Sequence, residues 1–299
     1  MISGIINVYK EKGFTSHDVV AKMRGILRQK KIGHTGTLDP AAEGVLPVCL
    51  GVGTKLCDML TDTDKTYRAV LLLGQSTDTQ DTTGTILREA PVNCTEEQVK
   101  ECIFSFLGSY EQIPPMYSAL KVNGKRLYEL ARAGVEVERK ARRVRIQEIQ
   151  LERMELPEVT FTVTCSKGTY IRTLCHDIGE KLGCGGCMKR LERIRVGSFT
   201  VDKSLRLSQI EALQEEGKLM EAVVPVDGMF PELPAACVLP EFDKLVKNGN
   251  PLKREQLREC PEPAPGSRLR VYDFRGMFCG IFRWDEKKHH YLTEKMFLQ

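Results

Sequence analysis

The residues that raise a chemical question lie in GHTGTLDPAAEGVLPVCLG, residues 33–51. His34 and Asp39 stand on a turn rich in glycine and threonine, and an apolar run follows. Taken alone, an aspartate before a proline is typical of a turn, and an isolated histidine is more typical of a structural hydrogen bond than of catalysis. A carboxylate can also act as a base or a nucleophile, so other parts of the chain must decide what Asp39 does.

Two other groups have spacings that suggest metal or redox chemistry. The run CGGC, Cys184 to Cys187, has the spacing of a zinc knuckle or a redox pair. No second CxxC or histidine pair follows it at a ligand distance, so we interpret it as incidental. Four aspartates match no calcium-binding loop, and such Asp–Thr clusters usually form turns and caps. These are Asp62, Asp64, Asp78 and Asp81. We therefore predict no metal.

Composition restricts the classes of protein to which the chain can belong. Its 299 residues, 41% hydrophobic and 28% charged, are typical of a globular protein with a sizeable core. No apolar run approaches the roughly 18 residues of a membrane span, and the first residues lack the pattern of an export signal. The eleven cysteines are scattered and mostly set in apolar segments, as expected of free thiols in a reducing compartment. We therefore expect a cytoplasmic protein with no membrane partner.

The distribution of charge favours a polyanionic partner. The net charge is only +4, from 44 basic and 40 acidic residues. The segment 121–145 nevertheless holds nine basic and three acidic residues, a local surplus of six. One such run is usually a solvated helix face, but a second basic group lies at 189–195, and tyrosines lie within or beside the first. Two such runs with aromatic residues favour nucleic acid.

Periodicity and capping signals predict the elements that must position these residues. Alternating or β-branched runs predict strands at 4–10, 66–74, 144–154 and 158–166. Helical spacing predicts helices over 18–27 with Ser16 as N-cap, over 95–108 with Thr95 as cap and Gly108 as end, over 170–183 and over 207–223. After a proline-rich boundary near residue 235, short strands at 267–274 and 277–284 predict a small β module.

Several long segments, in order, resemble the bacterial tRNA pseudouridine-55 synthases, the TruB family. They are GHTGTLDPAAEGVLPVCLG, TDTDKTYRAVLLLGQSTDTQDTTG, QIPPMYSALKVNGKRLYELARAG and CSKGTYIRTLCHDIGEKLGCG. The opening NVYKEKGFTSHDVV is similar to the KPxGxTS stretch of that family, with Glu11 where proline is common. Near the C-terminus, VKNGNPL at 246–252 resembles the PUA-like module of the family.

The resemblance implies an α+β fold, the pseudouridine synthase fold, with a mixed, mainly antiparallel sheet flanked by helices. It implies a catalytic domain over 1–235 and a C-terminal PUA-like RNA-binding β module over 236–299. The basic segment at about 115–145 resembles a thumb-like insertion that closes on the T-arm of tRNA. We expect six of its residues to contact RNA: Lys121, Lys125, Arg126, Arg142, Arg143 and Arg145. The last three are not expected to enter the uridine pocket.

The resemblance also implies an isomerase that converts uridine 55 of the T-arm of tRNA to pseudouridine. This reaction breaks the bond from ribose C1′ to uracil N1, turns the base and rejoins it through C5, so no cofactor is implied. Asp39 matches the family's catalytic aspartate, either as a nucleophile at the sugar or as a base that removes a ribose proton. Arg172 resembles its partner arginine, whose charge would offset the cost of an ionised carboxylate in a dry pocket.

Other positions match residues that handle the target base, which must leave its stack before Asp39 can reach it. Tyr67 matches the tyrosine that stacks on the flipped base and helps with the proton at C5. His34 resembles the residue that fills the vacated space, and Leu191 a hydrophobic residue of the pocket. The sequence pattern alone is equally consistent with structural roles, in which Tyr67 is an aromatic residue of a strand and Leu191 is a core residue. Further active-site positions of the family, without an assigned role, are Lys55, Asp81 and Tyr170.

Two other functions stay open. A tRNA-folding chaperone whose catalysis is secondary would show the same RNA-binding features, although the intact pair of Asp39 and Arg172 favours an enzyme. A guide-RNA-dependent pseudouridylase shares this core but usually carries a fuller PUA domain and basic extensions, which the short tail disfavours. We therefore expect a stand-alone, monomeric enzyme that binds tRNA without a guide RNA.

Overall fold

The computed structural model describes residues 1–122 and 124–298. Its largest sheet has nine strands, with the order β1-β3-β12-β4-β11-β10-β7, while β2 pairs with β3 and β13 with β12. The strands are β1 (Gly4–Lys10), β2 (Ile32–His34), β3 (Glu43–Leu50), β4 (Lys65–Leu73), β7 (Gly108–Gln112), β10 (Arg142–Glu155), β11 (Glu158–Cys165), β12 (Gly186–Val196) and β13 (Phe199–Thr200). Only β12 and β3 pair in parallel among the described strands of this sheet. The prediction of a mixed, mainly antiparallel sheet is confirmed.

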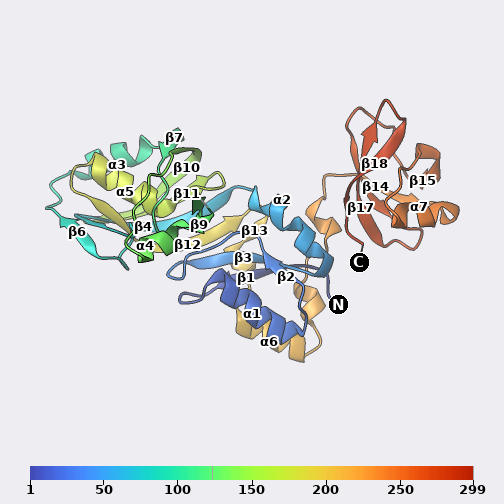
Figure 1. Cartoon of the computed structure of the whole chain (residues 1–299), viewed down its shortest axis with the longest axis horizontal. Coiled ribbons are helices and arrows are strands. Elements are labelled where there is room, and N and C mark those ends of the chain that lie inside the picture. The colour runs from blue at the N-terminus through green and yellow to red at the C-terminus, as the bar shows by residue number, and fades with distance from the viewer. Residues whose placement is uncertain (123, 299) are drawn as a thin grey trace.

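Helices flank the two halves of this sheet (Figure 1). The α-helices of this part are α1 (Ser16–Leu27), α2 (Cys57–Thr61), α3 (Glu96–Phe104), α4 (Leu127–Arg132), α5 (Ile171–Lys181) and α6 (Leu207–Glu215). α1 and α6 pack together against β1 and β3, and α3 and α5 pack against the half that contains β4, β10 and β11. None of the described helices has the length and apolar content needed to cross a membrane.

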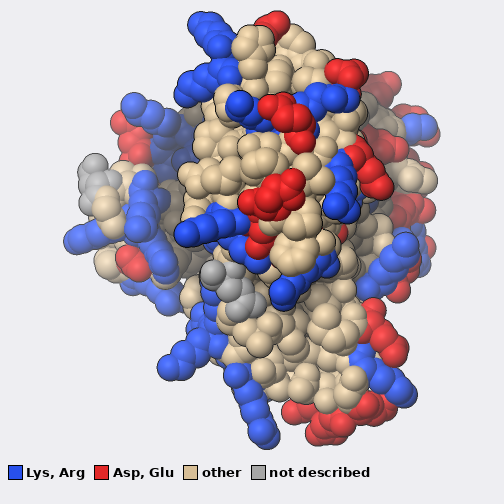
Figure 2. All heavy atoms as spheres, turned by 90° about the vertical axis from the view of Figure 1, so that its right-hand side faces the viewer, with Lys and Arg blue, Asp and Glu red and all other residues tan. Residues whose placement is uncertain are grey.

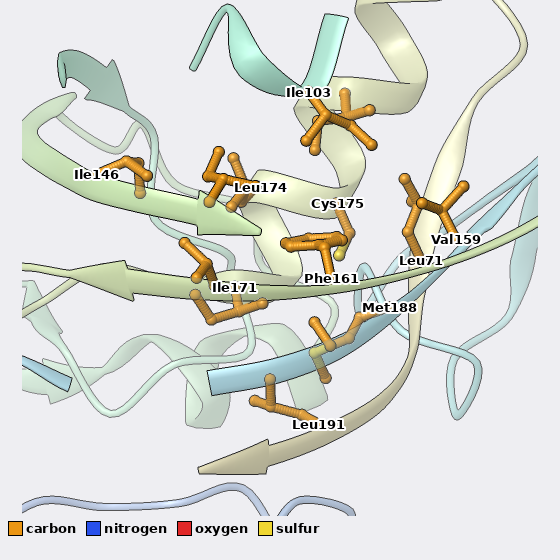
Figure 3. Close-up of a cluster of buried hydrophobic side chains, with 14 of the residues drawn as sticks. Leu71, Ile103, Ile146, Val159, Phe161, Ile171, Leu174, Cys175, Met188 and Leu191 are labelled. Carbon is orange, nitrogen blue, oxygen red and sulfur yellow. The ribbon is translucent and has the colours of Figure 1, made fainter. Parts of the chain in front are cut away.

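The core beneath α5 fixes the end of that helix at which Arg172 lies. Figure 3 shows Leu174 and Cys175 of α5 among Phe161 of β11 and Leu71 of β4, all of which are buried. Each aliphatic or aromatic side chain of this kind contributes roughly 1.5–3 kcal/mol when it is fully buried. The predicted spacing of apolar residues over 170–183 is therefore confirmed, and it anchors the first turn of α5 against the sheet.

The predicted N-cap of the first helix is wrong by one residue. Thr15 is the N-cap, because its hydroxyl accepts from the Asp18 amide while the Asp18 carboxylate accepts from the Thr15 amide. Ser16 is buried in the first turn instead, and its hydroxyl accepts from the backbone amide of Leu38 at 2.9 Å. This contact ties α1 to the turn that carries Asp39.

Two helices are shorter in the structure than the sequence patterns predict. Thr95 caps α3 as expected, but the helix ends at Phe104, and Gly108, with φ of 92°, begins β7. The predicted helix over 207–223 is interrupted at Gly217, with φ of 72°, between α6 and the short 3₁₀ helix η3 (Leu219–Ala222). A glycine in this left-handed conformation ends a helix readily, since it has no Cβ to clash.

The C-terminal residues form a second sheet of five strands, in the order β15-β14-β16-β17-β18. Its strands are β14 (Ala235–Val238), β15 (Leu257–Arg258), β16 (Arg268–Tyr272), β17 (Phe278–Asp285) and β18 (His290–Met296), with the short helix α7 (Asp243–Lys247) beside them. The strands predicted near 267–274 and 277–284 are confirmed. Ile281 and Phe297 of this module pack against Phe230 and Leu233 of the preceding segment. Figure 2, which faces this module, shows positive and negative side chains interspersed.

Two small hairpins project from the main sheet. β5 (Gln75–Thr77) pairs with β6 (Ile86–Glu89), and β8 (Lys121–Val122) pairs with β9 (Lys125–Arg126). The second hairpin and the adjoining α4 lie within the segment at about 115–145 that is predicted as a basic insertion and is called the basic insertion below.

Asp177 on α5 gives the fold a testable pH dependence. Burial, and secondarily the charge of Glu180, raises the pKa of this carboxyl to about 6. The ordinary pKa of an aspartate, which holds in the unfolded state, is about 4. Between about pH 4 and pH 6 the Asp177 carboxyl is therefore protonated in the folded state but not in the unfolded state, so the free energy of unfolding falls as the pH rises through this range. Asp177→Asn is expected to raise the Tm at pH 8, with a gain that shrinks below pH 6. Thermal unfolding at several pH values measures this, and an equal gain at pH 4 would contradict it.

Candidate active site

A cavity of about 630 Å³ lies where the turn after β2, strands β4 and β12, the start of α5 and the basic insertion meet. The structure brings together five of the residues predicted for the active site itself, from distant parts of the chain. They are Asp39, Tyr67, Tyr170, Arg172 and Leu191, all of which line the cavity.

Asp39 and Arg172 form an ion pair, with 2.9 Å between Oδ2 and Nε. The Arg172 side chain is only 4% exposed, whereas that of Asp39 is 41% exposed, so the carboxylate is open to the cavity. The expectation of a dry carboxylate is therefore wrong for this structure. Two further hydrogen bonds fix the guanidinium, from Nη1 to the carbonyl of Thr79 at 2.9 Å and from Nη2 to that of Tyr117 at 2.7 Å. Arg172 thus holds Asp39 in one position and also joins the basic insertion to it.

Backbone contacts fix the turn that carries Asp39. The amide of Thr35 donates to the carbonyl of Pro47, and the hydroxyl of Thr61 donates to the carbonyl of Thr35. The fully buried ammonium of Lys10 donates to the carbonyl of Phe14 at 2.6 Å and lies 3.5 Å from that of Pro40. Burial lowers the pKa of Lys10 to about 8, although the charge of Asp39 opposes this shift. Sequence reasoning did not single out Lys10, even though it lies in a stretch that carries the resemblance.

Tyrosines and a leucine line the cavity. Burial raises the pKa of Tyr67, on β4, against the opposing charge of Arg193. Burial also raises the pKa of Tyr170, so both phenols are neutral near pH 7. Tyr170 occupies the N-cap position of α5 without a side-chain capping bond, and its backbone amide and carbonyl both bond to the side chain of Gln112. Leu191 on β12 is almost fully buried. The cavity therefore offers planar and apolar surfaces next to one carboxylate.

Of the residues predicted for the active site itself, three do not line the cavity: Lys55, Asp81 and His34. Lys55 is placed elsewhere, since its ammonium donates to the carbonyls of Met296 and Leu298 and so ties the main sheet to the C-terminal module. Asp81 is buried behind Arg172, 3.9 Å from its Nε, and it accepts from Thr83 in its own loop. Lys55 therefore lies away from the active site in this structure, whereas Asp81 contacts the site through Arg172.

His34 lies at the end of β2, one residue before the cavity lining begins. Its Nδ1 accepts from the amide of Gly36 at 3.3 Å, and its ring meets that of His17 edge-on, with 6.1 Å between centroids. Burial lowers the pKa of His34, so its ring is neutral near pH 7. A neutral ring at the rim is a suitable surface for stacking.

The six basic residues predicted to contact RNA fall into two groups. Lys121, Lys125 and Arg126 are exposed on the β8–β9 hairpin. Arg142 and Arg143 line the cavity, and this corrects the expectation that they stay outside the pocket. Arg145 is exposed on β10. Strand β10 thus brings positive charge from the insertion to the cavity itself.

The residues considered above for metal or redox chemistry do not form a metal site or a disulfide in the part of the chain that the structure describes. Asp62 pairs with Lys167 at 2.7 Å, and Asp78 accepts from the amide of Thr85. Cys184 and Cys187 are free, buried thiols. Within residues 1–122 and 124–298, no three His, Cys, Asp or Glu side chains come together as metal ligands would.

Comparison with protein families relates most of the chain to one group. Residues 24–171 match the model of the TruB family pseudouridylate synthase N-terminal domain, and residues 172–230 match that of the tRNA pseudouridylate synthase B C-terminal domain. A tRNA pseudouridine synthase B of Lachnoclostridium phytofermentans is 53% identical over 99% of this chain and all of that protein. One of Alkaliphilus oremlandii is 44% identical over 97% of each.

Solved structures share the fold. A chain of an H/ACA RNP bound to a substrate RNA containing 2′-deoxyuridine superposes with a TM-score of 0.71, at 24% identity over 99% of this chain and 85% of that one. A chain of a Cbf5-Nop10-Gar1 complex gives the same TM-score at 26% identity, with the same coverage. The predicted pseudouridine synthase fold is thereby confirmed.

Proposed function

The chain belongs to the TruB family of pseudouridylate synthases, an isomerase family, and we propose that it converts uridine 55 in the T-arm of tRNA to pseudouridine. The observation that carries this proposal is the Asp39–Arg172 pair, whose carboxylate opens into a cavity lined by Tyr67 and Leu191. The names of the curated relatives support tRNA as the substrate.

The geometry suggests how each group acts once the target uridine has left its stack. Extruding a base costs a few kcal/mol, and stacking on an aromatic ring repays about 1–3 kcal/mol. Tyr67 provides that ring within the cavity, and the exposed Asp39 oxygen is free to reach the ribose, as a nucleophile or as a base. Arg142 and Arg143 supply positive charge at the same cavity for the phosphates of the flipped nucleotide.

We also propose that the protein acts as a stand-alone, monomeric enzyme in the cytoplasm, without a guide RNA. In this proposal residues 1–235 form the catalytic domain and residues 236–299 an RNA-binding module. The separate five-stranded sheet supports such a division.

A short transcript tests the proposed reaction. The purified chain alone is incubated with a T-arm stem-loop that carries uridine tritiated at C5, and the release of tritium to water is measured. Release is expected because the C5 proton must leave when C5 becomes bonded to C1′. A stem-loop with cytidine at position 55 and the label in its other uridines is the control. Equal release from both transcripts, or none from either, would contradict the proposal.

The exposed hairpin gives a prediction about salt dependence. If Lys121, Lys125 and Arg126 each contact a phosphate, replacing all three by Gln should flatten the slope of log Kd against log salt by about 2 to 3 units. Binding isotherms at several salt concentrations measure the slope. Single-turnover rates at saturating enzyme should stay near those of the unmodified chain, because none of the three lines the cavity.

A variant with the same loss of charge elsewhere is the matched control. Lys30, Lys203 and Lys218 are exposed and lie outside the insertion. Replacing these three by Gln should leave the slope unchanged. If both triple variants flatten the slope equally, the hairpin makes no specific phosphate contacts.

A further inference from the structure

Arg193 is a buried arginine that lines the same cavity and that neither sequence nor family comparison assigns a role. It is only 1% exposed and lies on β12, directly opposite Tyr67 on β4. Its Nε donates to the carbonyl of Val45 at 2.7 Å, and its Nη2 donates to that of Gly36 at 3.2 Å. The guanidinium is therefore fixed next to the turn that carries Asp39.

The backbone of β3 comes unusually close to this arginine. Gly44 has φ of 107°, and a Cβ at that position would lie 2.3 Å from the backbone oxygen of Arg193. Only glycine permits this approach. The close parallel pairing of β3 with β12, which places Gly44 opposite Arg193, therefore fixes the position of the Arg193 backbone.

The charges of the cavity are unbalanced. Among the described residues no carboxylate lies within salt-bridge distance of Arg193, or of Lys65, whose buried ammonium binds the carbonyls of Thr61 and Thr63. Arg172 is the third buried cation of the lining, and it is paired with Asp39 and, at 3.9 Å, with Asp81, so two of the three buried cations have no carboxylate partner. A buried charge without a counterion is costly, so an arrangement of this kind is suited to an anion that enters the cavity or forms in it.

The reaction supplies such an anion. When the bond from C1′ to N1 breaks, its electron pair stays on N1, and uracil departs with a negative charge shared by N1 and its two carbonyl oxygens. The electron-deficient C1′ is met by a bond to the carboxylate oxygen of Asp39 or by loss of the C2′ proton to it. C5 then bonds to C1′; in the first route this displaces the carboxylate of Asp39 from C1′, and in the second the protonated Asp39 returns its proton to C2′. In both routes the C5 proton is then released and N1 takes up a proton.

We propose that Arg193 is a catalytic residue whose guanidinium stabilises the departing uracil anion. This assignment rests on the proposed function but is independent of the choice between the two roles of Asp39. A fixed cation within a buried site stabilises charge that develops during the reaction more than water does, because it needs no reorganisation. Removing one such donor typically lowers kcat by about 10²–10³-fold.

A comparison of two substrates separates this role from a structural one. Arg193→Gln and Arg193→Lys are assayed in single turnovers at saturating enzyme, with uridine or 5-fluorouridine at position 55, by the consumption of that nucleoside. Fluorine stabilises the uracil anion by withdrawing electrons, so the departing base then depends less on Arg193. Arg68→Gln, which removes an exposed arginine from the neighbouring strand β4, is the control.

Arg193→Gln is expected to slow uridine consumption by about 10²–10³-fold, with Kd for the RNA nearly unchanged. Its penalty should be clearly smaller with 5-fluorouridine, and Arg193→Lys, which keeps the charge, should lose less. Equal penalties with both substrates would overturn the assignment and make Arg193 a support for the turn at Gly36, as would full activity of Arg193→Gln. If Arg193→Gln fails to fold, the two-substrate comparison is made with Arg193→Lys. Failure of the proposed function itself is distinguishable, because the unmodified chain would then form no pseudouridine.

Discussion

Replacing Asp39 by Asn is expected to abolish pseudouridine formation while RNA binding survives. The amide keeps the shape of the carboxylate but is neither a nucleophile nor a base, so the rate should fall by at least ~10⁴-fold, the upper end of what a general base contributes. RNA affinity should remain, since the basic hairpin and Arg142 and Arg143 are untouched. Single-turnover rates and binding isotherms measured on the same preparation test both parts.

Asp62 provides the matched control, because its carboxylate also lines the cavity but is paired with Lys167. Asp62→Asn should keep most of the activity. Appreciable turnover by Asp39→Asn would remove the catalytic assignment. It would also strengthen the alternative of a chaperone, for which the carboxylate is dispensable.

The second large effect is expected from Arg172→Lys. Lysine keeps the charge but cannot reach Asp39 and the carbonyls of Thr79 and Tyr117 together, as the planar guanidinium does. A displacement of the carboxylate by about 1 Å can cost 10²-fold in rate, so we expect a loss of that order. Each of these partly buried carbonyls left without a donor should also lower the free energy of unfolding, by up to about 1–3 kcal/mol.

Chemical denaturation and single-turnover rates of Arg172→Lys measure these two effects separately. Arg68→Lys makes the same change at an exposed ion pair with Glu152 and should leave both unchanged. If Arg172→Lys matched the unmodified chain in rate, Asp39 would not depend on the geometry of its partner.

Strands with clear patterns could be predicted from sequence, and features decided by distant contacts could not. The alternation along β10 and β11 follows directly from one buried face. The prediction of Ser16 as the cap, in contrast, overlooked Asp18, which lies three residues after Thr15 and completes a capping box with it, whereas Val19 stands three residues after Ser16. The buried contact between Ser16 and Leu38 favours Thr15 as the cap.

At the candidate site, too, some residues could be placed from the sequence and others could not. The resemblance brought Asp39, Tyr67 and Arg172 together correctly, because long motifs in register carry three-dimensional information. It misplaced Lys55, whose partners lie in the C-terminal module more than 200 residues away. Arg193 was hidden in a basic run, although it lies two residues after Leu191 and so shares its face of β12.

The most direct test of the central claim is site-resolved mapping of pseudouridine in an unmodified, full-length tRNA transcript incubated with the purified chain alone. One pseudouridine is expected, at position 55, and none when Asp39→Asn replaces the unmodified chain. Pseudouridine only at other positions, a need for an added guide RNA, or no pseudouridine at all would contradict the proposed function.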